Sequence, residues 1–169
     1  MRKLLFPLLF MILFVIGCEN MMNTPTMRVE HFFSNYQRMD STVLKELDLI
    51  LEKDTTMTGK QKNTYKELLK KQYQNLSYKI KSEETVRNQA ILEVEIEVLN
   101  YHDAIERTKK YFSENLIEES DYLDYQLEEM QKVEDFVKYT FTIYLNKVNG
   151  IWVMENLTES DRQKIHGLY

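Results

Sequence analysis

The spacing of hydrophobic residues changes along the chain from a helical period to strict alternation and back, which predicts an α+β domain. In the first third, apolar residues recur three and four positions apart, as on one face of a helix. They are Val29, Phe32, Phe33, Tyr36 and Met39, then Val43, Leu44, Leu47, Ile50 and Leu51. Thr26 and Ser41 are candidate N-caps. The pattern leaves open whether these residues form one bent helix or two. A third, strongly charged helix is predicted over 60–74.

Alternation then replaces the helical period. It begins at Tyr78-Lys79-Ile80-Lys81 and is clearest over 92–98, where even positions are apolar and odd positions are Glu. In an antiparallel hairpin the two lysines would lie across from the glutamates, and each opposite-charge pair contributes about 0.2–1 kcal/mol. Charge complementarity therefore predicts both the partner and the register of this first hairpin.

Two helical stretches separate this hairpin from a second one. One carries Ala104, Ile105, Thr108, Tyr111 and Phe112; the other follows Ser120, a candidate N-cap, and carries Tyr122, Leu123, Leu127, Met130 and Val133. Alternation returns over 137–145, and Asn149-Gly150 predicts a type I′ turn because both residues tolerate positive φ. A two-residue loop pairs Val148 with Ile151 and Leu145 with Met154. A short helix then opens at Thr158 and ends near Gly167.

The first residues have the pattern of an export signal. Arg2 and Lys3 precede an apolar run over 4–16, which as a helix would span about 20 Å. A bilayer core is about 30 Å thick, so the run has the length of a signal segment rather than of a membrane span. The tetrapeptide Val15-Ile16-Gly17-Cys18 resembles the lipobox of bacterial lipoproteins. The resemblance implies lipid on Cys18 and cleavage between Gly17 and Cys18.

These features divide the chain into three parts. Residues 1–17 are expected to be removed, residues 18–25 to form the lipidated cysteine and a short tether, and residues 26–169 to form a single α+β domain. Cys18 is the one cysteine in the chain, so a disulfide within the domain is excluded. Stable anchoring needs more than one acyl chain, because a single chain gives only marginal membrane binding.

The charge argues against nucleic acid as a partner. The formal net charge is −5, and removal of Arg2 and Lys3 with the signal takes it to −7. An acidic domain is repelled by nucleic-acid phosphate and by anionic lipid headgroups. We therefore expect no nucleic-acid binding.

Candidate catalytic groups are few. The three histidines, His31, His102 and His166, form no two-His helical motif, so no metal site and no cofactor are predicted. His102 stands beside Asp103, which leaves a general-base role open, although a surface or cap role is favoured. His166 lies near the end of the last helix, where the helix dipole favours a cation. The sequence predicts that the protein is not an enzyme.

A candidate interaction surface follows from the parity of the second hairpin. Phe136, Tyr144, Ile151 and Val153 are expected on the wet face of the sheet, and exposed tyrosines are good contact residues. The alternative is that helices or a second copy of the chain cover this side.

The order of elements resembles the cone of the nuclear transport factor 2-like superfamily, also called ketosteroid-isomerase-like. There, N-terminal helices pack into the concave face of a curved antiparallel sheet. More narrowly, the chain resembles small lipoproteins of low-GC Gram-positive bacteria. The matching segments are 23–26, 29–36, 65–80, 94–98 and 149–158. The resemblance implies a cone-like α+β fold with a sheet of at least four strands, in two hairpins separated by two helices. It implies no activity.

Together these observations predict a lipid-anchored protein on the extracytoplasmic face of the cell membrane. The leading hypothesis is a non-enzymatic binding or interaction domain whose partner is an envelope protein or a small apolar ligand. One alternative is a small hydrolase or isomerase acting in the cone cavity, which would need an ionisable group on the inward face. The other is an accessory subunit for envelope assembly or transport, which would need an exposed apolar patch and a filled cone.

Overall fold

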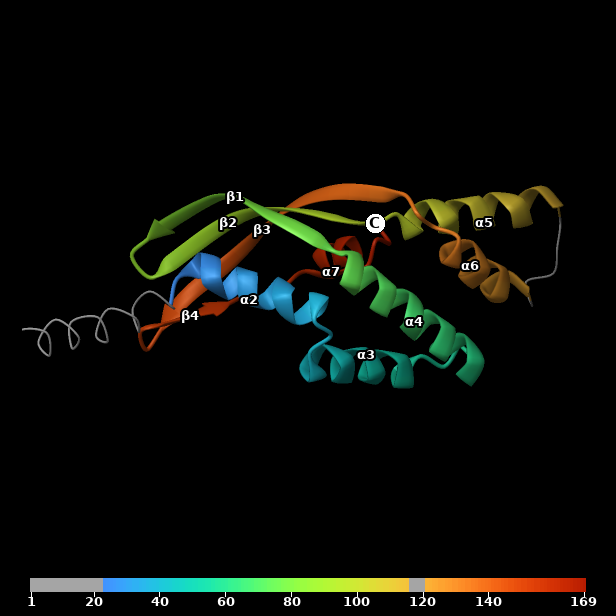
Figure 1. The fold of residues 1–169 in the computed structure, drawn as a ribbon, viewed down its shortest axis with the longest axis horizontal. Helices are drawn as coiled ribbons and strands as arrows, with labels where there is room; N and C mark the ends of the chain where they lie inside the picture. The colour runs from blue at the N-terminus through green and yellow to red at the C-terminus, as the bar shows by residue number, and fades with distance from the viewer. Residues whose placement is uncertain (1–22, 116–120) are drawn as a thin grey trace, which may run out of the picture.

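The computed structural model describes residues 23–115 and 121–169, which form helices packed on one antiparallel sheet (Figure 1). The elements are α2 (Pro25–Gln37), α3 (Ser41–Lys53), α4 (Gly59–Asn75), β1 (Ser77–Val86), β2 (Gln89–Leu99), α5 (Tyr101–Asn115), α6 (Tyr122–Gln131), β3 (Phe136–Val148), β4 (Ile151–Met154) and α7 (Glu159–Ile165). The predicted α+β class, with two hairpins separated by two helices, is confirmed.

The four strands lie in the order β1-β2-β3-β4, and each neighbouring pair is antiparallel. The central pair, β2 with β3, joins the two hairpins across the α5–α6 excursion. In the first hairpin Lys79 lies opposite Glu95, and the Lys81 ammonium lies 3.2 Å from the Glu95 carboxylate. The charge-based register is therefore confirmed.

The first hairpin is longer than the alternation predicts. β1 continues to Val86, with a bulge at Lys81, and turns through Arg87, whose φ is 56°. The second hairpin follows the prediction: Asn149 and Gly150 have φ of 51° and 82°, and Val148 pairs with Ile151. Both turns lie at the same end of the sheet, because β2 begins beside the end of β3.

The helices at the start of the chain begin differently from the prediction. Thr24, not Thr26, caps α2, since its hydroxyl accepts a hydrogen bond from the Met27 N–H. Asp40, not Ser41, caps α3 through the Thr42 N–H at 2.9 Å. The two helices are separate, because Met39 adopts a φ of 57° between them. Thr26 instead donates to the Glu83 carboxylate at 2.6 Å, which ties α2 to β1.

One face of the sheet and the inner faces of α2, α3, α4 and α7 form the main core. Phe33 stacks on Tyr78 with 4.7 Å between ring centroids, and Trp152 is buried on the same side. The fully buried residues include Val29, Phe33, Leu92, Val94, Ile96 and Val98. The helices cover this inner face, whereas no described helix covers the opposite, outer face in Figure 1.

A second, smaller core joins α4 to α5 and α6, which extend beyond the sheet at the end away from the turns (Figure 1). Gln72 links the two cores. Its side chain is fully buried, accepts from the Leu99 N–H at 2.8 Å and donates to the Leu99 carbonyl at 3.0 Å. The end of β2 is thereby fastened to α4.

Candidate functional site

Apolar side chains stand on the outer face of the sheet near the two turns. We call this set the outer patch: Val86, Ile91, Tyr144, Val148, Ile151 and Val153, each between 43% and 59% exposed. Alternation along β2 and β3 places them there, since their sequence neighbours Leu92, Ile143 and Leu145 point into the core. The same alternation that builds the core therefore exposes this patch.

Strand register makes the patch contiguous. Ile91 lies directly opposite Tyr144, and Val148 lies directly opposite Ile151. Residues facing each other across an antiparallel pair have Cβ atoms about 4.5–5.5 Å apart. Val153 of β4 lies opposite Asn146 of β3. Asn146 is two positions from Tyr144 and two from Val148, so Val153 is a diagonal neighbour of both. A ligand of this surface would thus contact several aliphatic groups and one phenol at once.

Of the four residues predicted for an interaction surface, the structure brings three together. Tyr144, Ile151 and Val153 belong to the outer patch, whereas Phe136 is 49% exposed at the other end of β3, opposite Leu99. Eight residues of strand separate Phe136 from Tyr144, which is about 27 Å. Ile91 and Val148 were not predicted, although the alternation of β2 and the Val148–Ile151 pairing contained the signal for both.

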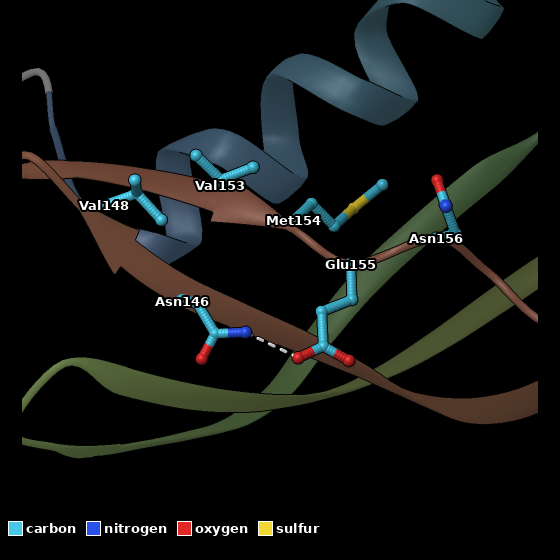
Figure 2. A pocket seen from close by; sticks show the side chains of 6 residues that line it. All are labelled: Asn146, Val148, Val153, Met154, Glu155 and Asn156. Carbon is cyan, nitrogen blue, oxygen red and sulfur yellow. Dashed lines mark hydrogen bonds between the residues drawn. The ribbon is translucent and has the colours of Figure 1, made fainter.

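A shallow hollow of about 650 Å³ adjoins the patch. Figure 2 shows the side chains that line it: Asn146, Val148, Val153, Met154, Glu155 and Asn156. The Asn146 amide donates to the Glu155 carboxylate at 2.6 Å, drawn as a dashed line in Figure 2. The hollow combines the apolar side chains of Val148, Val153 and Met154 with this hydrogen-bonded polar pair.

The helix side of the sheet holds a polar group in a nearly closed space. The Tyr73 hydroxyl and His166 Nε2 lie 3.0 Å apart, beside a cavity of about 20 Å³ that Tyr36, Glu46 and Arg162 also line. A space of this size holds about one water molecule. The site has a proton donor and an imidazole but no room for an organic substrate.

Burial sets the protonation of these groups. Burial, helped by the nearby Arg162 guanidinium, lowers the pKa of His166 to about 4. Burial also raises the pKa of Tyr36 to about 12 and raises that of Tyr73. At neutral pH the imidazole is neutral, so the cation expected at the end of the last helix is not present. The loss of solvation outweighs the favourable helix dipole.

The other predicted groups lie apart. His102 is the second residue of α5, and its backbone N–H donates to the Gly167 carbonyl at 2.7 Å. Across 23–115 and 121–169, the buried polar side chains are Gln72 and Thr108, neither of them an acid. No cluster of three or more His, Cys, Asp or Glu among these residues is placed to hold a metal ion. Nor does any helix in these ranges have the length and apolarity to cross a membrane.

Gly17 and Cys18 lie outside the described residues, which begin at Asn23. The Asn23 amide donates to the Gly150 carbonyl at 2.6 Å, and its carbonyl oxygen accepts from the Trp152 N–H at 3.2 Å. These two bonds cover the free edge of β4 at the turn. Among the described residues, Asn23 thus already contacts the folded domain, although it lies inside the segment predicted as tether.

The chain was compared with known protein families, with curated proteins and with solved structures. No known protein family matches the sequence, and no curated protein matches it either. Among solved structures, the chain is similar to that of a candidate lipoprotein, ycdA, of Bacillus subtilis. The identity is 18% and the TM-score 0.42, over 64% of this chain and 38% of that one. A likeness at this level is no basis for assigning a fold or a function, and the chain spans less than two fifths of that protein.

Proposed function

We propose that the chain is an extracytoplasmic lipoprotein, held at the cell membrane by lipid on Cys18, whose folded part is a non-enzymatic interaction domain. The basic start, the short apolar run and the lipobox-like Val15–Cys18 support the anchor. Given that anchor, the domain would be held near the bilayer, since Asn23, which is hydrogen-bonded to Gly150 and Trp152, follows Cys18 by five residues.

The observation that carries the interaction role is the contrast between the two sides of the sheet. On the helix side, side chains fill the interior and leave about 20 Å³ beside His166. On the outer side, six apolar residues form a contiguous surface that is about half exposed. Large exposed apolar patches mark interaction sites in soluble domains. Binding through the surface of the sheet therefore fits better than binding inside a cone.

Catalysis inside the fold is the weaker hypothesis. The buried imidazole is that of His166, whose pKa is lowered to about 4, and its Nε2 is already bonded to the Tyr73 hydroxyl. A general base must reach the proton that it removes, within hydrogen-bond distance or through one water molecule. The acid on the inner face of the described strands is Glu83, opposite Leu92; it is exposed and accepts from the Thr26 hydroxyl. The buried polar side chains of the described residues, Gln72 and Thr108, are not acids, so a buried base–acid pair for an isomerase or hydrolase is not assembled there.

A relation to the nuclear transport factor 2-like cone is part of the same proposal. Helices on one face of a four-stranded antiparallel sheet support it. Because side chains fill its interior, this chain would be a member of that superfamily without the binding cavity of the cone.

The anchor can be tested in the natural host with an alkyne-bearing fatty acid and mass analysis of the N-terminus. We expect acyl label on the wild-type protein and a mature chain that starts at Cys18. The Cys18→Ala variant should lose the label and keep residues 1–17, while the matched Met21→Ala variant should behave as wild type. An unmodified Cys18 in the natural product would refute the assignment.

A further inference from the structure

The point where the anchor segment enters the domain coincides with the end of the sheet that bears the outer patch. Asn23 is hydrogen-bonded to Gly150 and Trp152 at the β3–β4 turn. The β1–β2 turn lies beside it, because the Lys147 N–H donates to the Asn88 carbonyl at 2.7 Å. In Figure 1 both turns and the start of α2 lie at one end of the molecule, and α5 and α6 lie at the other.

The length of chain before Asn23 limits how far this end can stand from the membrane. Five residue steps separate Cys18 from Asn23, and a fully extended chain covers at most about 18 Å in that distance. With Cys18 held by lipid, the turn end must stay within about that distance of the headgroups. Contact with the bilayer is then intramolecular, at a high effective concentration.

The chemistry of the turn end differs from that of the rest of this acidic chain. Segments 85–92 and 139–154 contain no Asp or Glu, although the chain has 27 acids. Their charged residues are Arg87 and Lys147, one near each turn, and both are exposed; Lys147 belongs to the inner face, with its ammonium 5.4 Å from the centroid of the Trp152 ring. A basic residue beside exposed aliphatic groups suits the polar–apolar boundary of a bilayer, where apolar groups enter and cations meet phosphate.

On the outer face, apolar and acidic residues are also separated along the strands. We call the residues that pair across neighbouring strands a row. Val148 and Ile151 are nearest the turn, and Val153 comes next, in a row with Asn146. Acids enter one row further on: Glu84 lies opposite Ile91, and the Glu155 N–H donates to the Tyr144 carbonyl at 2.8 Å. The apolar rows can therefore meet the membrane before the acidic row reaches the headgroups.

From these observations we propose that the outer patch docks on the lipid bilayer to which the chain is anchored. Val148, Ile151 and Val153 enter the interfacial region, and Arg87 in the β1–β2 turn faces lipid phosphate. This inference rests on the proposed lipoprotein anchor and identifies the partner of the outer patch. The occupant is a lipid surface, because the anchor, the two turns, the aliphatic groups and the basic residues share one end.

The test uses the full lipidated protein, its acylation verified by mass, in vesicles of phosphatidylglycerol and phosphatidylethanolamine. An environment-sensitive thiol label is placed on the outer face with Gln89→Cys, which leaves the patch intact, or at the distal end with Lys110→Cys. Cys18 carries lipid, so the added thiol is the reactive one. Spin-labelled lipid should quench the label at position 89 and leave the label at position 110 unquenched.

A triple variant, Val148→Thr with Ile151→Thr and Val153→Thr, should undock this end while keeping β-branched residues in the strands. Each half-exposed aliphatic group that leaves water contributes about fivefold to the equilibrium, so the docked fraction relative to undocked should fall by about a hundredfold. The matched control, Leu49→Gln with Ile50→Gln, removes comparable exposed apolar surface from α3 and should keep the quenching. Circular dichroism checks that each variant is folded.

Three outcomes overturn the proposal. They are an unquenched label at position 89 in anchored protein, equal quenching at both positions, and unchanged quenching in the threonine variant. If the label is shielded in native membranes but not in protein-free vesicles, the partner is an envelope protein, and the interaction role stands without the lipid surface. Failure of the anchor itself would appear earlier, as missing acylation.

Discussion

The buried amide of Gln72 provides the sharpest test of how this fold is held together. This side chain connects α4 to the end of β2. Its oxygen accepts from the Leu99 N–H, and its nitrogen donates to the Leu99 carbonyl. Gln72→Leu keeps a similar volume and apolar stem but removes both hydrogen bonds. The variant therefore separates the contribution of these hydrogen bonds to stability from the contribution of side-chain packing.

The expected cost follows from the groups that are left behind. In the variant, the N–H and carbonyl of Leu99 would both be buried without these partners, and each such group costs about 1–3 kcal/mol. Burying a leucine in place of an amide returns part of this cost. We expect a loss of about 2–4 kcal/mol in the free energy of unfolding, which corresponds to roughly 6–12 °C in Tm for a domain of this size.

Urea denaturation followed by circular dichroism measures this loss, with Gln74→Leu as the control. Gln74 lies on the same helix but is exposed, so its replacement should change stability by less than about 0.5 kcal/mol. Equal stabilities of the two variants would refute the reasoning, because the two buried hydrogen bonds of Gln72 would then contribute no more to stability than an exposed amide.

Two further predictions use the turn glycines and the buried imidazole. Gly150→Ala should cost about 1 kcal/mol, since φ is 82° but the added methyl group meets nothing within 4 Å; Gly167→Ala should cost clearly more, because its Cβ would lie 2.1 Å from the Leu99 carbonyl oxygen. Denaturation of both variants gives the comparison, and equal costs would contradict it. The folded pKa of His166, about 4, lies below the unfolded value of 6.5, so the unfolded state takes up a proton first as the pH falls. Stability should therefore be complete above pH 6.5 and fall towards pH 4 by about 2 kcal/mol, which is less than the full shift implies because part of the ring keeps contact with solvent. His166→Phe should flatten this slope and His31→Gln should not, which denaturation at several pH values measures.

The sequence predicted what is determined by near neighbours. The β3–β4 register follows from two residues that tolerate positive φ, and the structure has Val148 opposite Ile151 as the turn requires. The β1–β2 register follows from complementary charges, and Lys81 pairs with Glu95. In both cases the information lies within one hairpin, so the residues themselves specify the pairing.

Features that depend on distant contacts were not predictable in the same way. The pairing of β2 with β3 crosses more than thirty residues, and the alternation in each strand says which face is buried but not which edge pairs. The alternation along β3 correctly predicted that Phe136 lies on the outer face. It did not predict where Phe136 lies relative to the other strands, so the separation of Phe136 from Tyr144 was missed. Burial of His166 also depends on packing between α4 and α7, which the sequence pattern does not show.

The acidity of the chain as a whole opposes docking on an anionic membrane, but the position of the charges determines which end of the molecule is repelled. With residues 1–17 removed, as proposed, the formal charge is −7, and it acts at a headgroup only through acids within about a Debye length, roughly 8 Å at physiological salt. The turns carry Arg87 and Lys147 with no acid in either segment, while acids begin at Glu84 and Glu155 and continue towards α5 and α6. Repulsion of the distant acids would then turn the molecule so that its apolar end meets the lipid. The same net charge that argues against flat adsorption thus favours an upright orientation on the anchor.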